Sequence, residues 1–305
     1  MKKHGIGRRS QSEARNLALE AGKISYTWQA KDGTQKRITR QKRYVNNDFF
    51  KSWTPAMAYV LGVVFTDGCV QNNLLSIGQK EPELLEKVRA LMCSNHPLRF
   101  SPKRGVAGEL YQLPIYSKKI YDDLVGFGLK APKSRTIRFP DIPAEYIRHF
   151  LRGCWDGDGS IYLLQGGWNP WASYVSGSRV FIESLAESLY KLGLPRVTVY
   201  TSKTKSFNIK YSDRGCAKLY HLFYDGVDSS IHLTRKYLKF RLAAAILEHK
   251  KAKRPRTKEQ QELLFYKMAT VEKGVAGILQ EMAALEEQMQ GYISDSASEK
   301  GGDSP

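Results

Sequence analysis

Tyr59-Val-Leu-Gly-Val-Val-Phe-Thr-Asp67-Gly68 and Phe150-Leu-Arg-Gly-Cys-Trp-Asp-Gly-Asp158-Gly159 are two versions of one pattern. Each version is a short apolar run with a glycine at the same place, and each ends in Asp-Gly. The final acids lie 91 residues apart in sequence, from 67 to 158, which indicates an internal duplication of domain size. A duplicated fold with one acid in each half can bring two carboxylates together on a pseudo-twofold axis.

Composition points to an acidic, polymeric partner. Lys and Arg number 48 against 30 Asp and Glu, which gives a net charge of +18 in 305 residues. Nucleic acid fits this charge better than a membrane does, because the chain has no long basic amphipathic helix and no lipidation motif. The longest apolar run, residues 56–65, is too short to span a bilayer. The N-terminus has charges but no apolar core behind them, so it does not read as a signal peptide.

The cysteines indicate a reducing compartment. Four are present, widely spaced and without the spacing of a zinc site: Cys69, Cys93, Cys154 and Cys216. We interpret them as reduced thiols. The expected location is therefore the cytoplasm (with the nucleoid) or an organelle matrix, and the protein is not expected to be secreted.

The paired pattern resembles the LAGLIDADG motif, the signature of a large family of homing endonucleases. Residues 60–68 occupy the nine motif positions in the first copy, and residues 151–159 occupy them in the second. The resemblance is to the single-chain, two-motif type and covers about residues 46–245. It implies an α+β fold of two pseudo-symmetric αββαββα repeats whose sheets form a saddle for DNA.

Periodicity and turn residues predict the same element order twice. The first copy is expected to contain helices at 55–67, 82–94 and 118–127, and strands within 69–79 and at 98–101 and 109–116. Gly68 is expected to end the first helix in the left-handed conformation. The second copy is expected to contain helices at 144–158, 178–192 and 214–224, and strands at 160–165, 171–176, 196–201 and 206–211. The predicted organisation is an N-terminal segment (1–45), a first repeat (46–140), a second repeat (141–247), a basic tract with a long helix (248–290) and a disordered tail (291–305).

The two ends of the chain each leave two interpretations open. Residues 4–15 resemble the last helix of small helix-turn-helix segments, with a helix starting near Glu13. A solvated basic arm that contacts phosphates is preferred, because a complete helix-turn-helix does not fit in this segment. Near the C-terminus an apolar stripe with alternating steps of four and three runs along Leu264, Met268, Val271, Val275, Ile278, Met282, Leu285 and Met289. We expect this helix to pack on its own chain as part of a monomer; dimerisation is the alternative.

The motif suggests a metal-dependent site. Gly62 and Gly153 each cost a helix about 1 kcal/mol, which makes sense where two helices cross closely. The resemblance implies that Asp67 and Asp158 then meet at the base of the saddle and hold Mg²⁺ or Mn²⁺ with the main-chain oxygens of Thr66 and Gly157. Asp156 is left out of this set because Phe65 occupies its place in the first copy.

The resemblance also implies polar residues around the attacking water. Gln79 and Lys118 match these positions in the first repeat, and Ser178 and Arg214 in the second. Ser178 is also a plausible helix N-cap. A serine in place of glutamine suggests that the two strands are cut at unequal rates.

Strand alternation locates the expected DNA face. With Val197 and Val199 inward, the residues between them point outward. The residues expected to contact DNA are Lys80, Arg99, Ser101, Lys103, Arg104, Gln112, Arg135, Arg179, Arg196, Thr198, Tyr200, Lys203, Lys205 and Lys210.

The sequence therefore predicts a site-specific double-strand DNA endonuclease that hydrolyses phosphodiesters with a divalent metal, one motif acid serving each strand of a long pseudo-symmetric site. Two alternatives share the fold: an RNA-binding maturase that acts on an intron, and a DNA-binding regulator without catalysis. The presence of both motif acids favours the nuclease.

Overall fold

The computed structural model describes residues 26–29, 35–38, 43–101, 110–130, 135–163 and 169–252, and six positions between 277 and 284. In the N-terminal segment the strands β1 (Tyr26–Gln29) and β2 (Gln35–Ile38) pair antiparallel, with Tyr26 opposite Ile38. A strand pair was not anticipated there. The helix predicted near Glu13 lies outside the described residues.

The two predicted repeats are present. The first consists of α2 (Pro55–Asp67), β3 (Gly68–Gln71), β4 (Leu74–Gln79), α3 (Pro82–Leu91), β5 (Arg99–Ser101), β6 (Leu110–Tyr116) and α4 (Lys118–Gly126). The second consists of α5 (Ile147–Asp158), β7 (Gly159–Leu163), β8 (Pro170–Ser176), α6 (Arg179–Lys191), β9 (Tyr200–Thr201), β10 (Phe207–Ser212) and α7 (Asp213–Tyr224). This is αββαββα twice, as predicted.

Each repeat forms one antiparallel four-stranded sheet, and the two sheets share one topology. The orders are β3-β4-β6-β5 and β7-β8-β10-β9. Gly68 pairs with Ile77 in the first sheet, and Gly159 pairs with Tyr174 in the second. Because the strands pair in the same register, each paired residue of the first sheet has an equivalent residue in the second, as Ile77 has in Tyr174.

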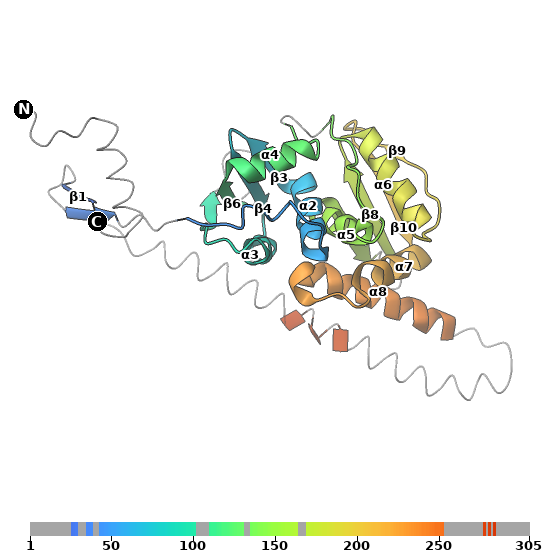
Figure 1. Cartoon of the computed structure of the whole chain (residues 1–305). Coiled ribbons are helices and arrows are strands. Elements are labelled where there is room, and N and C mark those ends of the chain that lie inside the picture. The colour runs from blue at the N-terminus through green and yellow to red at the C-terminus, as the bar shows by residue number, and fades with distance from the viewer. Residues whose placement is uncertain are drawn as a thin grey trace, which may run out of the picture.

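The motif helices α2 and α5 cross at their glycines, between the two sheets (Figure 1). A Cβ added to Gly62 would lie 2.2 Å from the main-chain oxygen of Phe150, and one added to Gly153 would lie 2.0 Å from that of Tyr59. Only glycine lets the two backbones approach this closely. The crossing inferred from the sequence is therefore confirmed, and its cost in helix propensity is offset by packing.

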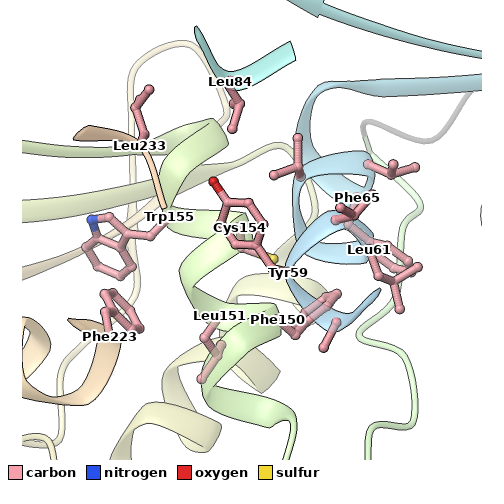
Figure 2. Close-up of a cluster of buried hydrophobic side chains, with 14 of the residues drawn as sticks. Tyr59, Leu61, Phe65, Leu84, Phe150, Leu151, Cys154, Trp155, Phe223 and Leu233 are labelled. Carbon is pink, nitrogen blue, oxygen red and sulfur yellow. The ribbon is translucent and has the colours of Figure 1, made fainter. Parts of the chain in front are cut away.

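Aromatic rings pack around the crossing and close the core. Phe65 of α2 meets Phe150 of α5 edge to face, with ring centroids 5.3 Å apart. On the other side of α5, Trp155 packs against Phe223 of α7 with centroids 5.7 Å apart (Figure 2). The two repeats therefore share one hydrophobic core rather than two separate ones.

A buried polar cluster ties the second motif helix to the loop that follows α7. The Tyr59 hydroxyl and the Leu233 amide both donate to Asp156 Oδ2 at 2.8 Å. Arg152 donates through Nε and Nη1 to the main-chain oxygens of Ile231 (2.7 Å) and Phe223 (2.9 Å). Burial raises the pKa of Asp156 and lowers that of Arg152 to about 10. Asp156, which the sequence comparison leaves out of the metal-binding set, therefore makes polar contacts inside the protein.

Three local expectations were wrong. Gly68 is extended, with φ of −82°, not left-handed; a Cβ there would lie 2.6 Å from the Val64 main-chain oxygen, so close approach explains this glycine. Residues 196–199 are not paired as a strand, because β9 contains only Tyr200–Thr201. The helix expected from 144 begins at Ile147, after a turn.

Helix α8 (Thr234–Ala252) was not anticipated, and it crosses the boundary expected at 247. It follows the short 3-10 helix η1 (Ser229–Ile231) and runs beneath α5 in Figure 1. Leu242 and Ile246 of α8 form a small buried cluster with Ile278, a residue of the predicted apolar stripe. This supports packing of the stripe on its own chain. In the described part of the chain, no helix is long and apolar enough to cross a bilayer.

The glycine crossing can be tested by a matched pair of substitutions. Gly153→Ala should lower the free energy of unfolding by about 1–3 kcal/mol, because the new methyl group forces the helices apart. Gly126→Ala adds the same methyl group to α4, where nothing lies within 4 Å of the new Cβ, and should leave stability unchanged or raise it by up to about 1 kcal/mol. Urea unfolding of both variants measures the difference. Equal effects would mean that the helices do not depend on this contact.

Candidate nuclease site and nucleic-acid interface

Asp67 stands at the end of α2 with its carboxylate held by two neighbours. Gln79, the last residue of β4, donates from Nε2 to Asp67 Oδ2 at 2.6 Å. The Thr66 hydroxyl lies 3.2 Å from the same oxygen. The side chain of Asp67 is half-buried. Gln79, which the resemblance places near the attacking water, thus makes a hydrogen bond to the charged group of Asp67.

The end of α5 touches this carboxylate. A Cβ added to Gly157 would lie 2.5 Å from Asp67 Oδ2 and 2.0 Å from the Thr66 hydroxyl. Asp158 is the next residue and is exposed. Burial raises the pKa of Tyr174 well above its usual value, and Asp158 and Asp67 are among the neighbours that raise it further. One carboxylate from each repeat therefore influences the same side chain, Tyr174.

Lys236 of α8 places a positive charge at the C-terminal end of α5. Its Nζ donates to the main-chain oxygens of Trp155 and Asp156, both at 2.6 Å, and lies 3.3 Å from that of Gly157. These are carbonyls at the C-terminal end of α5, where a cation is favoured. Burial lowers the pKa of Lys236 to about 8, while Asp67 and Asp158 are among the groups that raise it.

Lys236 was not among the predicted site residues, because helix α8 was not predicted. A signal was present: Leu238, Leu242 and Ile246 repeat every four residues after Thr234, a potential N-terminal residue of a helix. The charge of Lys236 alone would not have identified it, because the chain has 48 Lys and Arg residues.

The sheet register corrects the assignment of Ser178. Because Ile77 corresponds to Tyr174, the counterpart of Gln79 is Ser176, not Ser178. Ser178 is buried and is the N-cap of α6: its hydroxyl accepts from the Phe181 amide at 3.4 Å and donates to the Ile137 main-chain oxygen at 2.6 Å. The catalytic assignment of Ser178 is therefore withdrawn, and its alternative as a cap is confirmed.

Lys118 and Arg214 occupy equivalent places but do not reach the acids in the described contacts. Leu113 pairs with Ile77 and Ile209 pairs with Tyr174, so the residues five positions later, Lys118 and Arg214, correspond. Both side chains are exposed, and Lys118 pairs with Asp122 at 2.6 Å. At the start of α4 and within α7, these residues lie where a bound polyanion could draw them from such surface pairs.

The outward face of the second sheet contains a groove of about 780 Å³. It is lined by Tyr162, Trp171, Arg196, Val197, Thr198, Tyr200, Asn208 and Lys210. Four of the predicted contact residues are among them: Arg196, Thr198, Tyr200 and Lys210. Although residues 196–199 are unpaired, the predicted alternation holds, with Val197 and Val199 packed toward the core. Tyr162, Trp171 and Asn208 were missed, although alternation along β10 places Asn208 on the same face as Lys210.

The first sheet presents a smaller set of the predicted contact residues. Arg99 pairs with Gln112 across β5 and β6, and Ser101 pairs with Leu110. Lys80 follows β4 and is exposed. Lys103 and Arg104 lie outside the described residues. The remaining predicted contacts, Arg135, Arg179, Lys203 and Lys205, are all exposed, and Arg179 forms an ion pair with Glu183 at 2.7 Å.

The family comparison agrees with the geometry. Residues 145–232 match a family described as the LAGLIDADG-like domain. This span covers α5 through η1 and therefore the second motif and its sheet. The second repeat is therefore similar to this domain, and the first repeat has the same element order and sheet register as the second.

Two curated relatives come from Methanocaldococcus jannaschii. One, "DNA-directed RNA polymerase subunit Rpo1C", is 25% identical over 49% of this chain and 17% of the relative. The other, "Probable translation initiation factor IF-2", is 26% identical over 54% of this chain and 13% of the relative. The chain thus spans less than a fifth of either relative.

Solved structures similar to this chain include DNA complexes. The homing endonuclease I-WcaI bound to its DNA recognition sequence has a TM-score of 0.46 and 16% identity, covering 63% of this chain and 90% of that one. Full-length DUF199/WhiA from Thermatoga maritima has a TM-score of 0.39 and 8% identity, covering 83% and 72%. Because both TM-scores are below 0.5, the fold is described from the topology of the two repeats and from the family match of residues 145–232.

The corrected role of Ser178 has a direct test. Ser178→Ala should lower the free energy of unfolding by about 1 kcal/mol, because α6 loses its N-cap. Nucleic-acid binding by the folded protein should stay within about twofold, which is less than the effect of one typical hydrogen bond. Thermal unfolding and a binding titration with duplex DNA measure the two quantities. A loss of binding without a loss of stability would contradict the cap assignment.

Proposed function

We propose that this protein is a site-specific double-strand DNA endonuclease that hydrolyses one phosphodiester in each strand. The observation that carries the proposal is the meeting of the two motif helices: Gly157 of α5 lies against the Asp67 carboxylate of α2, and Asp158 is the residue after Gly157. A pair of acids supplied by two similar repeats matches the symmetry of a duplex, in which two antiparallel strands present two scissile phosphates.

Both sheets support a duplex as the partner. Their outward faces present Arg99 and Gln112 on one side and the groove with Arg196, Tyr200 and Lys210 on the other. Long basic side chains supply the contacts to phosphates, and outward polar residues on strands can read base edges in the major groove. A net charge of +18 favours association with DNA and makes it dependent on salt.

The donor set fits a hard divalent cation such as Mg²⁺ or Mn²⁺. Asp67, Asp158 and the main-chain oxygens of Thr66 and Gly157 supply only oxygen, which is the ligand type that such ions prefer. No group of three or more His, Cys, Asp or Glu side chains suited to a metal occurs among the described residues, so solvent and phosphate would complete the coordination. When bound, the cation would supply Lewis acidity and help to ionise water.

The reaction is a hydrolysis. A water oxygen attacks phosphorus, the P–O3′ bond breaks, and the products are a 5′-phosphate and a 3′-hydroxyl that takes up a proton. In this chain Gln79 orients the Asp67 carboxylate through the 2.6 Å hydrogen bond. Lys236 fixes the end of α5 and places a positive charge where negative charge accumulates in the transition state.

A library assay tests the proposal. The purified protein is incubated with Mg²⁺ and a randomised DNA library, and the ends produced are sequenced. The expected result is one long, pseudo-symmetric site cut with a stagger; the family resemblance suggests short 3′ overhangs. Binding to duplex DNA without any cleavage would favour the regulator of the same fold. Preferential binding to structured RNA without DNA cleavage would favour the maturase.

Asp67→Asn is the matched inactive variant. It should reduce cleavage of at least one strand by about a thousandfold or more while leaving DNA affinity within a few-fold, since it removes a charge at the reacting centre and keeps the shape. Gel-based cleavage of the selected site and a binding titration measure both effects. If this variant cleaved both strands at the wild-type rate, Asp67 would not be a catalytic residue.

A further inference from the structure

We propose that the two sheets select different base pairs at equivalent places of the target: an A·T pair under the second sheet where a G·C pair lies under the first. This selectivity rests on the proposed function, because it requires both outward sheet faces to lie in the major groove of one duplex. It is carried by one row of three residues on each sheet, which the shared strand register makes comparable.

Strand pairing identifies the two rows. Gln112 of β6 and Asn208 of β10 are equivalent, because each is the residue before the one that pairs with the equivalent residues of β4 and β8. Each of these amides has one cross-strand neighbour on either side. The first-sheet row is Gly78, Gln112 and Arg99, and the second-sheet row is Val175, Asn208 and Tyr200. Two pseudo-symmetric repeats would place these rows over base pairs at equal distances from the centre of the target.

The second-sheet row surrounds an amide with apolar surface. Val175 is 42% exposed and Tyr200 is 56% exposed. Asn208 lies between them on the outward face, since the next residue of β10, Ile209, is buried. Its Nδ2 lies 3.4 Å from the Tyr200 main-chain oxygen, a distance at which the contact is weak and a base edge can replace it.

This combination suits an A·T pair. An asparagine amide binds N6 and N7 of adenine together, and apolar side chains contact the methyl group of the thymine in the same pair. Adjacent strands lie about 4.8 Å apart, so Val175 and Tyr200 present their apolar surface within reach of the base pair that Asn208 contacts. The second-sheet row therefore has a partner for each half of an A·T pair.

The first-sheet row presents a charge instead. Its exposed end is Arg99 of the edge strand β5, and its other end is Gly78, which has no side chain. Leu110 packs beside Gly78, 3.1 Å from the place that a Cβ would take. A guanidinium donates to O6 and N7 of guanine together, which is the commonest base-specific contact of proteins. Because Gln112 alone would also accept adenine, Arg99 is the residue that decides for G·C.

The chemical difference between the rows is greatest at the edge strands. Both rows keep an amide at the centre, and the next outward positions of β4 and β8, Ser76 and Ser173, carry the same residue. Arg99 and Tyr200 place a cation and an aromatic ring at equivalent positions. This pair is therefore the specificity determinant to exchange.

Selection of bound duplexes from a randomised DNA library, without divalent metal, measures the preference independently of cleavage. We expect one symmetric pair of positions with G·C on one side and A·T on the other, each preferred at least about fivefold, the low end for a bidentate contact. Equal preferences at every symmetric pair of positions would overturn the inference and leave the nuclease proposal standing. If no duplex were enriched, the proposed function would fail, and the inference with it.

Tyr200→Arg assigns the A·T side to the second sheet. This variant gives the second-sheet row the edge residue of the first, so a repeated selection should change the A·T side to G·C and leave the other side as it was. The reciprocal variant, Arg99→Tyr, should reduce the preference for G·C on the other side by at least about fivefold. A change on neither side, or the same change on both, would contradict the assignment.

Tyr116→Arg is the matched control. Tyr116 ends β6 outside both rows and is 57% exposed, so the substitution adds the same charge at a tyrosine of the same exposure. The preference on the A·T side should stay within about twofold of the wild-type value. If Tyr116→Arg also produced G·C there, added charge and not the second-sheet row would set the preference, and the inference would fail.

Deoxyuridine in place of the selected thymine tests the methyl contact directly. Removing this methyl group should weaken binding by about fourfold, the value of one buried methylene-sized group. The same replacement at a thymine outside the selected site should leave the affinity unchanged. Equal affinity for the thymine and deoxyuridine duplexes would contradict the contact with Val175 and Tyr200.

Discussion

The close approach of two backbones at Gly62 and Gly153 is the constraint on which the rest of the structure depends. Main-chain atoms of one helix occupy the volume where the other would place a Cβ, so the two repeats cannot separate or rotate without opening the core. The same contact fixes where the two helices end. Asp67 and Asp158 are the last residues of these helices, and both are among the groups that raise the pKa of Tyr174 and of Lys236. The packing of the two repeats therefore also sets the geometry at the ends of the motif helices.

The polar residues inside this interface link it to the C-terminal part of the fold. Tyr59 and Leu233 share one oxygen of Asp156, while Lys236 holds the carbonyls before Asp158. Buried groups of this kind are costly unless each has a partner. Their arrangement makes helix α8 a structural element of the site, although it follows the second repeat in sequence. A substitution in α8 that removes the contacts of Lys236 should therefore change the surroundings of Asp67 and Asp158.

Much of this could be predicted from the sequence, and the failures have physical causes. The duplicated motif and the αββαββα order depend on local patterns and on a repeat, which a single sequence displays. Gln79 was assigned through the family resemblance, and its hydrogen bond to Asp67 is visible only in the structure. Ser178 was misassigned because loops of different length separate the equivalent positions, and only strand pairing shows that Ser176 is the counterpart of Gln79. Lys236 was missed because its role depends on a long-range contact with helix α5. The alternation of residues 196–199 predicts a strand. Alternation shows which side chains are buried, but it does not show whether the backbone is hydrogen-bonded to a neighbouring strand.

The proposed site requires that the helix crossing brings one carboxylate from each repeat into mutual range. A double-mutant cycle on the free energy of unfolding tests this, with Asp67→Asn, Asp158→Asn and both together, at low salt without divalent ions. Two nearby carboxylates repel each other, so removing either charge relieves the same repulsion. The double variant should therefore gain less stability than the sum of the single effects, by about 0.5 kcal/mol or more, and the difference should shrink in high salt. Additive effects at low salt would mean that the two acids do not meet, and would contradict the account.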